Sequence, residues 1–348
     1  MRQSFNAKEP RGQEGKRKLK PSLHGFFASL RQIHFRLALA LTLTTCSKPP
    51  LAEISGTTMG TTWHLKISKP AAEVKTRELP KVLQTRLNEI EGAITNWRDS
   101  PLKRFNANPS TDWTEVPREL AEMVSFSLQL SKETQGAFDV TISPLVDLWG
   151  FGSKGHITEP PSDAAIAAAK QHVGWNKLEV RAHPATLRKS DPLLQINVSA
   201  MADGYAVDEL TRILRRAGVK NFLLEIGGAV RAEGVNDEGK PWQVGIQQPF
   251  AQQGEPTSAL PLSNQSLSTS GVYRQYFEKD GKRYAHVLDA RSGRPIEHNL
   301  VSVSVITDSC FAADGWDTAL LILGPVEGRA LASKKEINAL FLEEKARP

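Results

Sequence analysis

The second half of the chain most constrains the fold, because from residue 222 to residue 307 it is a succession of strand-like segments. Segments 222–226 and 229–232 are separated by Gly227-Gly228, a pair of residues typical of a hairpin turn. Gly, Pro, Asn and Asp punctuate the segments that follow. Helical patterns stand before and after this region, without a regular alternation of strand and helix. This order predicts an α+β fold with largely antiparallel sheets rather than a doubly wound parallel sheet.

The spacing of apolar residues predicts the helices that pack with these strands. One helix begins near Pro80 and carries Leu83, Leu87, Ile90 and Ile94 on one face. Further helices are predicted at 117–135, from Ser162 through 164–169, at 201–217, at 312–323 and after Pro325. Further strands are predicted at 53–68, 176–182, 193–198 and 339–342.

The composition is that of an ordinary globular protein, with 40% hydrophobic and 24% charged residues. A sizeable core is therefore expected, and wholesale disorder is excluded. Basic residues before residue 40 bias the formal net charge of +6, and the remainder of the chain is close to neutral. Because no basic patch interleaved with aromatic residues occurs in this remainder, nucleic acid is not an expected partner.

The first 46 residues have the order of a secretory signal. A basic region ends at Arg36, and an apolar run at 37–45 leads to Cys46. The run is too short to span a bilayer, and a Cys at its end resembles the lipidated Cys of a bacterial lipoprotein. We therefore expect a leader at 1–46, a linker at 47–52, a folded domain at 53–348 and a lipid anchor on the periplasmic side of a bacterial membrane. An ordinary cleaved signal and a disordered basic leader are the alternatives.

Neither of the two commonest nucleotide-binding signatures occurs in the sequence. Instead, segment 56–63 combines two glycines with hydroxyl residues, which suits either close approach to a ligand or a bulged edge strand. Segments 136–145 and 148–152 place aromatic residues beside small ones, as a flat ring system or a buried strand requires. Segment 197–208 turns from a strand end into a helix, whose N-terminus favours phosphate.

Two further segments carry groups for catalysis and metal binding. His286 lies on a predicted strand that leads into a Gly/Pro turn, and it is either a general base or a structural histidine. Asp314 and Thr318 are four residues apart, so they share one helix face. A carboxylate and a hydroxyl there offer the oxygen ligands that Mg²⁺ prefers, although a surface Asp and a helix-interior Thr are the alternative. Asp317 is expected to be peripheral.

Together and in this order, the five segments resemble the ApbE family of FAD:protein FMN transferases, once described as thiamine-biosynthesis lipoproteins. The resemblance covers roughly residues 53–342. It implies an ApbE-like, T-fold-like arrangement in which antiparallel sheets pack with helices and the flavin site lies between two halves.

The resemblance also implies the residues of the site, position by position. The residues that match FAD contacts are Met59, Trp97, Ala137, Phe138, Asp139, Asn197, Asp203 and Leu288. The residues that match Mg²⁺ ligands are Ala200, through its carbonyl, with Asp314 and Thr318, and His286 matches the histidine proposed to assist catalysis. Asn197 departs from the family, which often has Asp there, and Asp203 stands where Lys or Glu is usual.

The activity that the resemblance implies is Mg²⁺-dependent transfer of FMN from FAD to a Thr or Ser of an acceptor protein, with release of AMP. The implied acceptors include subunits of Na⁺-pumping and related membrane redox complexes. One alternative is an FAD pyrophosphatase, in which water takes the place of the acceptor. The other is a non-catalytic FAD-binding lipoprotein, against which the intact pair of Asp314 and Thr318 argues.

Overall fold

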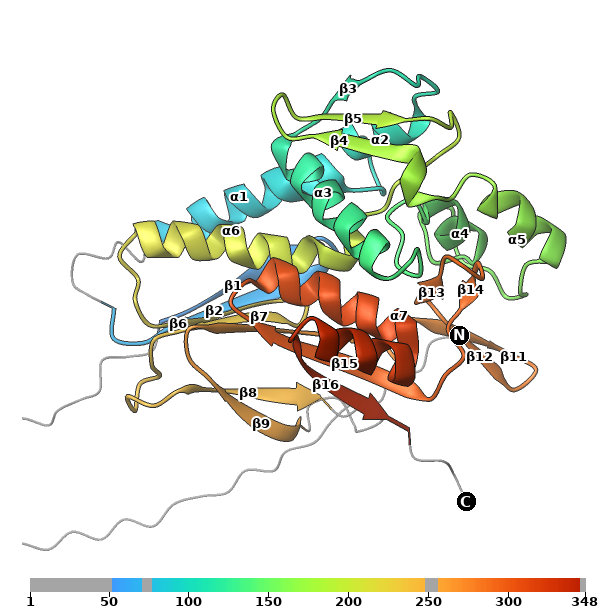
Figure 1. The fold of residues 1–348 in the computed structure, drawn as a ribbon. Helices are drawn as coiled ribbons and strands as arrows, with labels where there is room; N and C mark the ends of the chain where they lie inside the picture. The colour runs from blue at the N-terminus through green and yellow to red at the C-terminus, as the bar shows by residue number, and fades with distance from the viewer. Residues whose placement is uncertain (1–51, 71–76, 248–255, 345–348) are drawn as a thin grey trace, which may run out of the picture. The chain divides into compact units, whose positions relative to one another are not determined.

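A seven-stranded sheet with the strand order β1-β2-β6-β7-β10-β15-β16 organises the structure (Figure 1). The computed structural model describes residues 52–70, 77–247 and 256–344. The strands of this sheet are β1 (Ala52–Thr58), β2 (Thr61–Ile67), β6 (Phe222–Ile226), β7 (Ala229–Glu233), β10 (Gln265–Gly271), β15 (Leu300–Thr307) and β16 (Asn338–Glu343). Neighbouring strands pair antiparallel throughout. The predicted α+β class with antiparallel sheets is therefore confirmed.

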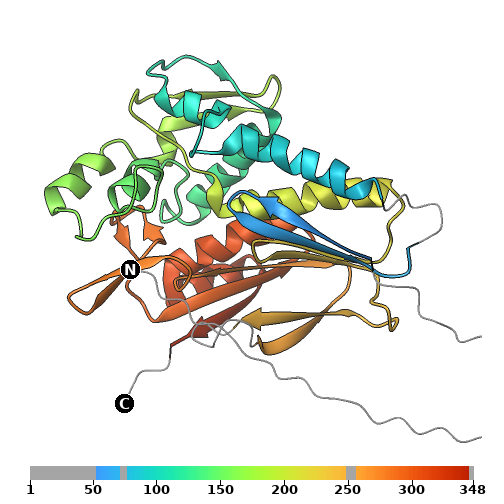
Figure 2. The same ribbon diagram turned by 180° about the vertical axis from the view of Figure 1, so that it is seen from behind.

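Three long helices cover one face of this sheet, and a hairpin covers part of the other face (Figures 1 and 2). The helices are α1 (Leu79–Ile94), α6 (Ala202–Arg216) and α7 (Cys310–Lys334), and the hairpin consists of β8 (Trp242–Gln247) and β9 (Pro256–Leu262). Gly324 has φ 77° and divides α7 into two helical parts just before Pro325, as the sequence predicts. Both faces of the sheet therefore bury apolar side chains, which favours a stable platform.

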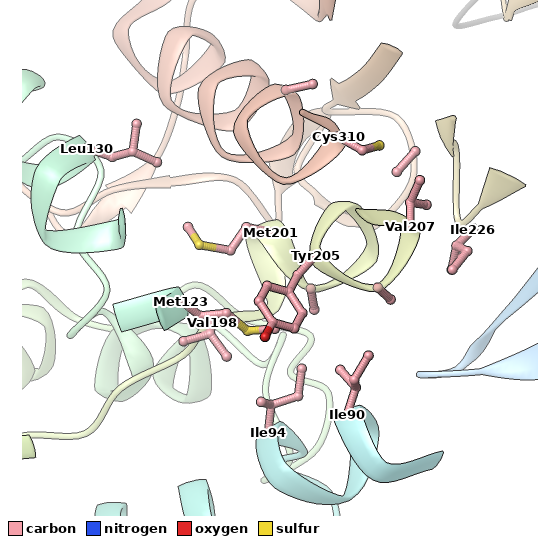
Figure 3. Close-up of a cluster of buried hydrophobic side chains, with 14 of the residues drawn as sticks. Ile90, Ile94, Met123, Leu130, Val198, Met201, Tyr205, Val207, Ile226 and Cys310 are labelled. Atoms are coloured by element: carbon pink, nitrogen blue, oxygen red, sulfur yellow. The ribbon is translucent and has the colours of Figure 1, made fainter. Parts of the chain in front are cut away.

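The main core lies between the helices and the sheet, and α6 is at its centre. Figure 3 shows Met201 and Tyr205 between Cys310 at the start of α7 and Ile90 and Ile94 on α1. These five side chains are all buried. The core thus fixes the N-terminal end of α6 against two other helices, and the predicted functional residues are close to this end.

A second group of elements lies between α1 and α6 in the sequence and packs against the helices, on their side away from the large sheet (Figure 1). Its helices are α2 (Pro101–Ala107), α3 (Arg118–Glu133), α4 (Ser143–Leu148) and α5 (Asp163–Lys170), with short 3-10 turns at η1 (Trp175–Lys177) and η2 (Ser199–Met201). Its small sheet contains β3 (Thr114–Glu115), β5 (Thr186–Lys189) and β4 (Leu178–Arg181). Two hairpins complete the fold, β11 (Tyr276–Lys279) with β12 (Lys282–Ala285), and β13 (Leu288–Asp289) with β14 (Arg294–Pro295).

The predicted strand at 193–198 is wrong. In this segment Gln195 forms only an isolated bridge with Ile142, and the strand that pairs with β4 is β5. The physical reason is a turn at Asp191, whose side chain accepts a hydrogen bond from the Leu193 backbone N–H at 3.0 Å. Such local bonds compete with the ladder of a sheet.

The leader, the linker and Cys46 lie outside the described residues, apart from Ala52, which begins β1. Among the residues that are described, no helix has the length and apolar character needed to cross a bilayer.

Lys189 on β5 is fully buried and joins the small sheet to α2. Its ammonium donates to the carbonyls of Leu194 at 3.0 Å and of Phe105 at 3.3 Å. Phe105 belongs to the last turn of α2, where carbonyl groups lack partners within the helix. Burial lowers the pKa of Lys189, which is the expected cost of taking an ammonium group out of water.

We expect Lys189→Met to lower the free energy of unfolding by about 1–3 kcal/mol, because it leaves buried carbonyls without a donor. Chemical denaturation measures this loss. Lys132→Met on the exposed side of α3 is the control and should change stability by less than about 0.5 kcal/mol. Equal effects of the two substitutions would contradict the assigned role of Lys189.

Candidate active site

A cleft of about 890 Å³ opens between the two groups of elements. Its walls come from the turn between β1 and β2, the end of α1, α2, the loop after α4 and the start of α6. Four of the predicted FAD contacts line it, namely Met59, Trp97, Asn197 and Asp203. The volume falls in the range of pockets that hold small molecules and cofactors.

A tight turn presents Met59 to the cleft. Met59 and Gly60 have φ values of 47° and 77°, as the two-residue turn between β1 and β2 requires. The Met59 backbone N–H donates to Glu91 Oε2 on α1 at 3.0 Å. Glu91 also pairs with Arg98 at 3.1 Å, so one carboxylate connects the turn with the loop between α1 and α2.

Trp97 is the most exposed large apolar side chain along the cleft, with 72% of its surface accessible. It lies in the short loop between α1 and α2, which Ser100 fixes by accepting from the Lys103 N–H at 2.9 Å and donating to the Thr95 carbonyl at 2.6 Å. An aromatic ring held open on a rigid loop can stack on a flat ligand.

Asp314 on α7 lies where α7, α6 and β10 meet. Its Oδ2 accepts from the Gly204 backbone N–H at 2.8 Å, and its Oδ1 accepts from Ser268 Oγ at 2.9 Å. Burial raises the pKa of Asp314 to about 6 in spite of these two hydrogen bonds. The alternative of a surface Asp at this position is therefore wrong, because Asp314 joins two neighbouring elements.

Thr318 lies one turn further along α7, as predicted, and its hydroxyl is 2.6 Å from Ser270 Oγ. Asp317 is not peripheral, which corrects the sequence-based expectation. Its side chain is fully buried, and its Oδ1 accepts from Ser270 Oγ at 3.0 Å and from Thr318 Oγ1 at 3.2 Å. Burial and then the charge of Asp314 raise the pKa of Asp317 well above its usual value.

Asp203 lies at the start of α6, against the turn between β6 and β7. A Cβ atom on Gly227 would lie 2.2 Å from Asp203 Oδ2, and Gly227 has φ 58°, so a larger residue does not fit there. Burial and then the nearby Asp314 raise the pKa of Asp203 to about 8. Arg274 opposes this rise, although its guanidinium donates to the Gly227 carbonyl at 2.7 Å rather than to a carboxylate.

These contacts test whether the residues fit a cation. The acidic cluster, which we define as Asp203, Asp314 and Asp317, gathers carboxylates whose charges disfavour one another. Asp317 Oδ2 is buried without a hydrogen-bond partner in the described residues. No set of three or more His, Cys, Asp or Glu side chains in the described ranges is arranged to hold a metal alone. With η2, which carries Ala200, packed against α7, the arrangement fits a hard cation bound by few protein oxygens.

His286 lies between β12 and β13, at the edge of the cleft. Its Nδ1 is 3.1 Å from the carbonyl oxygen of Gln275, which lines the cleft. Since a carbonyl only accepts, Nδ1 carries the proton of the neutral ring and Nε2 keeps a free lone pair. Burial lowers the pKa of His286, so the ring is neutral at pH 7 and Nε2 can accept a proton. Its ring also contacts the cleft residue Phe151, with centroids 6.3 Å apart.

The remaining four predicted FAD contacts are not among the residues that line the cleft. Ala137, Phe138 and Leu288 are buried in the core. Asp139 is buried too, and its carboxylate accepts from the backbone N–H groups of Thr141 and Trp175, each at 2.8 Å. These four residues are buried and do not line the cleft, and their direct contact with FAD stays a prediction.

Some residues of the site escaped the sequence-based prediction. Two of these residues are Arg274 and Gln275, which lie in the connection between β10 and β11. Asp208 caps α7, because its carboxylate accepts from the Cys310 N–H at 2.9 Å and from Ser309 Oγ at 2.7 Å. This charge at a helix N-terminus joins α6 to α7.

Known proteins share both the sequence and the fold. The family model described as "ApbE family" matches residues 59–341. The FAD:protein FMN transferase of Escherichia coli K12 is 38% identical over 319 residues, which is 88% of this chain and 90% of that protein.

Two solved structures show the same likeness. The apo form of the flavinyl transferase ApbE of Pseudomonas stutzeri has a TM-score of 0.78 and 38% identity, covering 85% of this chain and 92% of that one. The flavin transferase ApbE of Vibrio cholerae has a TM-score of 0.78 and 34% identity, and the match covers 85% of this chain and 95% of that one. The family match and these similarities over most of the chain show that the protein belongs to the ApbE family.

Proposed function

We propose that this protein uses Mg²⁺ and FAD to attach FMN through a phosphoester bond to a Thr or Ser of an acceptor protein, releasing AMP. As a member of the ApbE family, the chain is a flavinyl transferase, an enzyme of the FAD:protein FMN transferase type. One observation carries the finer proposal. Asp203 of the acidic cluster lines the same cleft as Met59 and Trp97, and Asp314 is close enough to Asp203 for its charge to raise the pKa of Asp203.

The cleft supplies the binding energy for FAD. Trp97 offers an aromatic face, and Met59 offers a flexible apolar side chain on a fixed turn. Lys103 on α2 also lines the cleft and adds a positive charge for a phosphate group. Because these contacts surround the ligand, they position it for reaction as well as bind it.

Asp314, Thr318 and the carbonyl of Ala200 would hold the Mg²⁺ ion. When bound, the ion neutralises charge on the diphosphate of FAD and eases the departure of AMP. Gly204 and Ser268 hold the Asp314 carboxylate in place by hydrogen bonds at 2.8 and 2.9 Å. The protein thus fixes its ligand before substrate arrives, as electrostatic catalysis requires.

His286 or a nearby carboxylate takes the proton of the acceptor hydroxyl. The acceptor hydroxyl oxygen forms a bond to the FMN-side phosphorus as the bond from that phosphorus to the bridging oxygen of AMP breaks. The hydroxyl proton moves to Nε2 of His286, and the electron pair of the broken bond leaves with AMP. The Gln275 carbonyl, by accepting from Nδ1 at 3.1 Å, keeps Nε2 available for this proton.

Mass spectrometry tests the proposal directly. The purified protein is mixed with FAD, Mg²⁺ and an acceptor peptide that contains Thr or Ser, and the peptide is examined for an added FMN mass. Release of FMN and AMP without an adduct would instead indicate an FAD pyrophosphatase. Binding of FAD without either product would indicate a flavin-binding protein without catalysis.

We predict that Asp314→Asn lowers the transfer rate about 10²-fold or more at ordinary Mg²⁺ concentrations. The substitution keeps the size of the side chain while removing the full negative charge assigned to the ion. Asp308→Asn is the matched control, because Asp308 is exposed just before α7 and outside the acidic cluster. A wild-type rate and Mg²⁺ requirement in Asp314→Asn would show that the cation assignment is wrong.

A second prediction concerns the ligand. The protein should bind FAD more tightly than FMN, because the cleft should contact the adenylate part as well. Trp97→Ala should weaken FAD binding about 2–10-fold through loss of an aromatic contact, while Trp97→Tyr should largely preserve it. Titration followed by flavin fluorescence measures both effects, and equal affinities for FAD and FMN would count against the site.

A third prediction concerns localisation. We propose that the protein is exported and anchored on the periplasmic side of a bacterial membrane by lipid on Cys46, where membrane redox subunits could serve as acceptors. Wild-type protein should fractionate with membranes, and Cys46→Ala should be soluble, because stable anchoring needs more than one acyl chain. A native protein whose N-terminal residue carries no lipid would refute the anchor.

A further inference from the structure

Asp317 is a fully buried carboxylate to which the proposed reaction gives no role. It belongs to a hydrogen-bonded triangle with Ser270 on β10 and Thr318, its neighbour on α7. Asp317 Oδ1 is 3.0 Å from Ser270 Oγ and 3.2 Å from Thr318 Oγ1, and the two hydroxyl oxygens are 2.6 Å apart. Burying a carboxylate is costly, so such a group calls for a compensating partner.

The protons of the triangle determine which way the Thr318 hydroxyl faces. A carboxylate only accepts hydrogen bonds, whereas each hydroxyl has one proton and two lone pairs. We place both hydroxyl protons inside the triangle, toward Asp317 or toward the other hydroxyl, because each pair of oxygens is within hydrogen-bond distance. In each such arrangement Thr318 keeps at least one lone pair directed outside the triangle. A lone pair in that position is what a cation needs from a hydroxyl ligand.

We propose that Asp317 is a positioning residue for the cation site, which turns the Thr318 hydroxyl so that its lone pair faces the cation and adds negative charge behind it. The inference rests on the proposed function, since it takes Asp314 and Thr318 as the ligands. Residues behind metal ligands often fix ligand orientation in this way.

A second observation supports a charged rather than a purely structural role. Asp317 Oδ2 has no hydrogen-bond partner in the described part of the chain, although it is buried. A carboxyl group that served only to join β10 and α7 would gain stability by engaging both oxygens. A cation held by the adjacent Thr318 compensates the charge that the hydrogen bonds leave unbalanced.

The experiment measures cation binding without catalysis. Mn²⁺ is titrated into flavin-free protein and followed by electron paramagnetic resonance, for wild type, Asp317→Asn, Thr318→Val and the double variant. Asp317→Asn keeps the size of the side chain, but its amide donates hydrogen bonds and can turn the two hydroxyls the other way. Asp308→Asn is again the control for loss of one negative charge near α7. Circular dichroism and thermal unfolding check the fold of each variant.

We expect Asp317→Asn to weaken Mn²⁺ binding about 10–100-fold. In the Thr318→Val background the same substitution should cause little further loss, because there is no longer a hydroxyl to orient. The control should bind as wild type does. If Asp317→Asn does not fold, Asp317→Ser, which places a smaller neutral group in the same space, carries the same expectation.

Two outcomes would overturn the inference. One is wild-type Mn²⁺ affinity in Asp317→Asn, and the other is an equal loss with and without the Thr318 hydroxyl. Neither result contradicts the proposed function as long as Asp314→Asn, measured in parallel, loses its affinity for Mn²⁺. Unchanged affinity in Asp314→Asn as well would instead refute the cation assignment itself.

Discussion

The close approach of α6 and α7 is the constraint on which the rest of the site depends. A Cβ atom at Gly204 would lie 2.4 Å from the Cys310 carbonyl oxygen and 2.6 Å from the Asp314 Cβ, which no side chain tolerates. The absence of a side chain lets the Gly204 N–H reach Asp314, while Asp208 one turn later caps α7. The two helices are thereby locked at the place where the acidic cluster forms.

The serines of β10 complete this arrangement from the side of the sheet. Because side chains alternate along a strand, Ser266, Ser268 and Ser270 face the same way. Ser268 Oγ donates to Asp314 Oδ1 at 2.9 Å, and Ser270 Oγ donates to Asp317 Oδ1 at 3.0 Å. Small hydroxyl residues let the helix approach the sheet closely and still provide donors for the buried carboxylates. These hydrogen bonds offset only part of the free-energy cost of burying the carboxylates. The acidic cluster therefore still favours a positive charge nearby.

The sequence predicted long elements well and the contacts between elements poorly. The helices α1 and α6 and the hairpin of β6 and β7 follow from apolar spacing and glycine positions. The short helices α2 and α4 have too few turns to show a period, and the Asp191 turn was mistaken for part of a strand. The sequence placed Asp314 and Thr318 on one helix face because they are four residues apart. The role of Asp317 was not, because its partner Ser270 is 47 positions away and only the fold brings them together.

The electrostatics of the cleft explains why cation and FAD should depend on each other in the proposed reaction. Burial raises the pKa of both Asp203 and Asp314, and the charge of Asp314 raises the pKa of Asp203 further. A diphosphate brought to the same end of the cleft would add negative charge and be repelled. A cation there reverses the sign of the local field, and the diphosphate in turn supplies oxygens that a site with few protein ligands lacks. In the proposed reaction the cation and FAD would therefore each complete the binding site of the other. By thermodynamic linkage, each would raise the affinity for the other by the same factor. In the proposed reaction the buried carboxylates would thus serve binding and catalysis, at a cost in stability that the packed α6–α7 contact offsets.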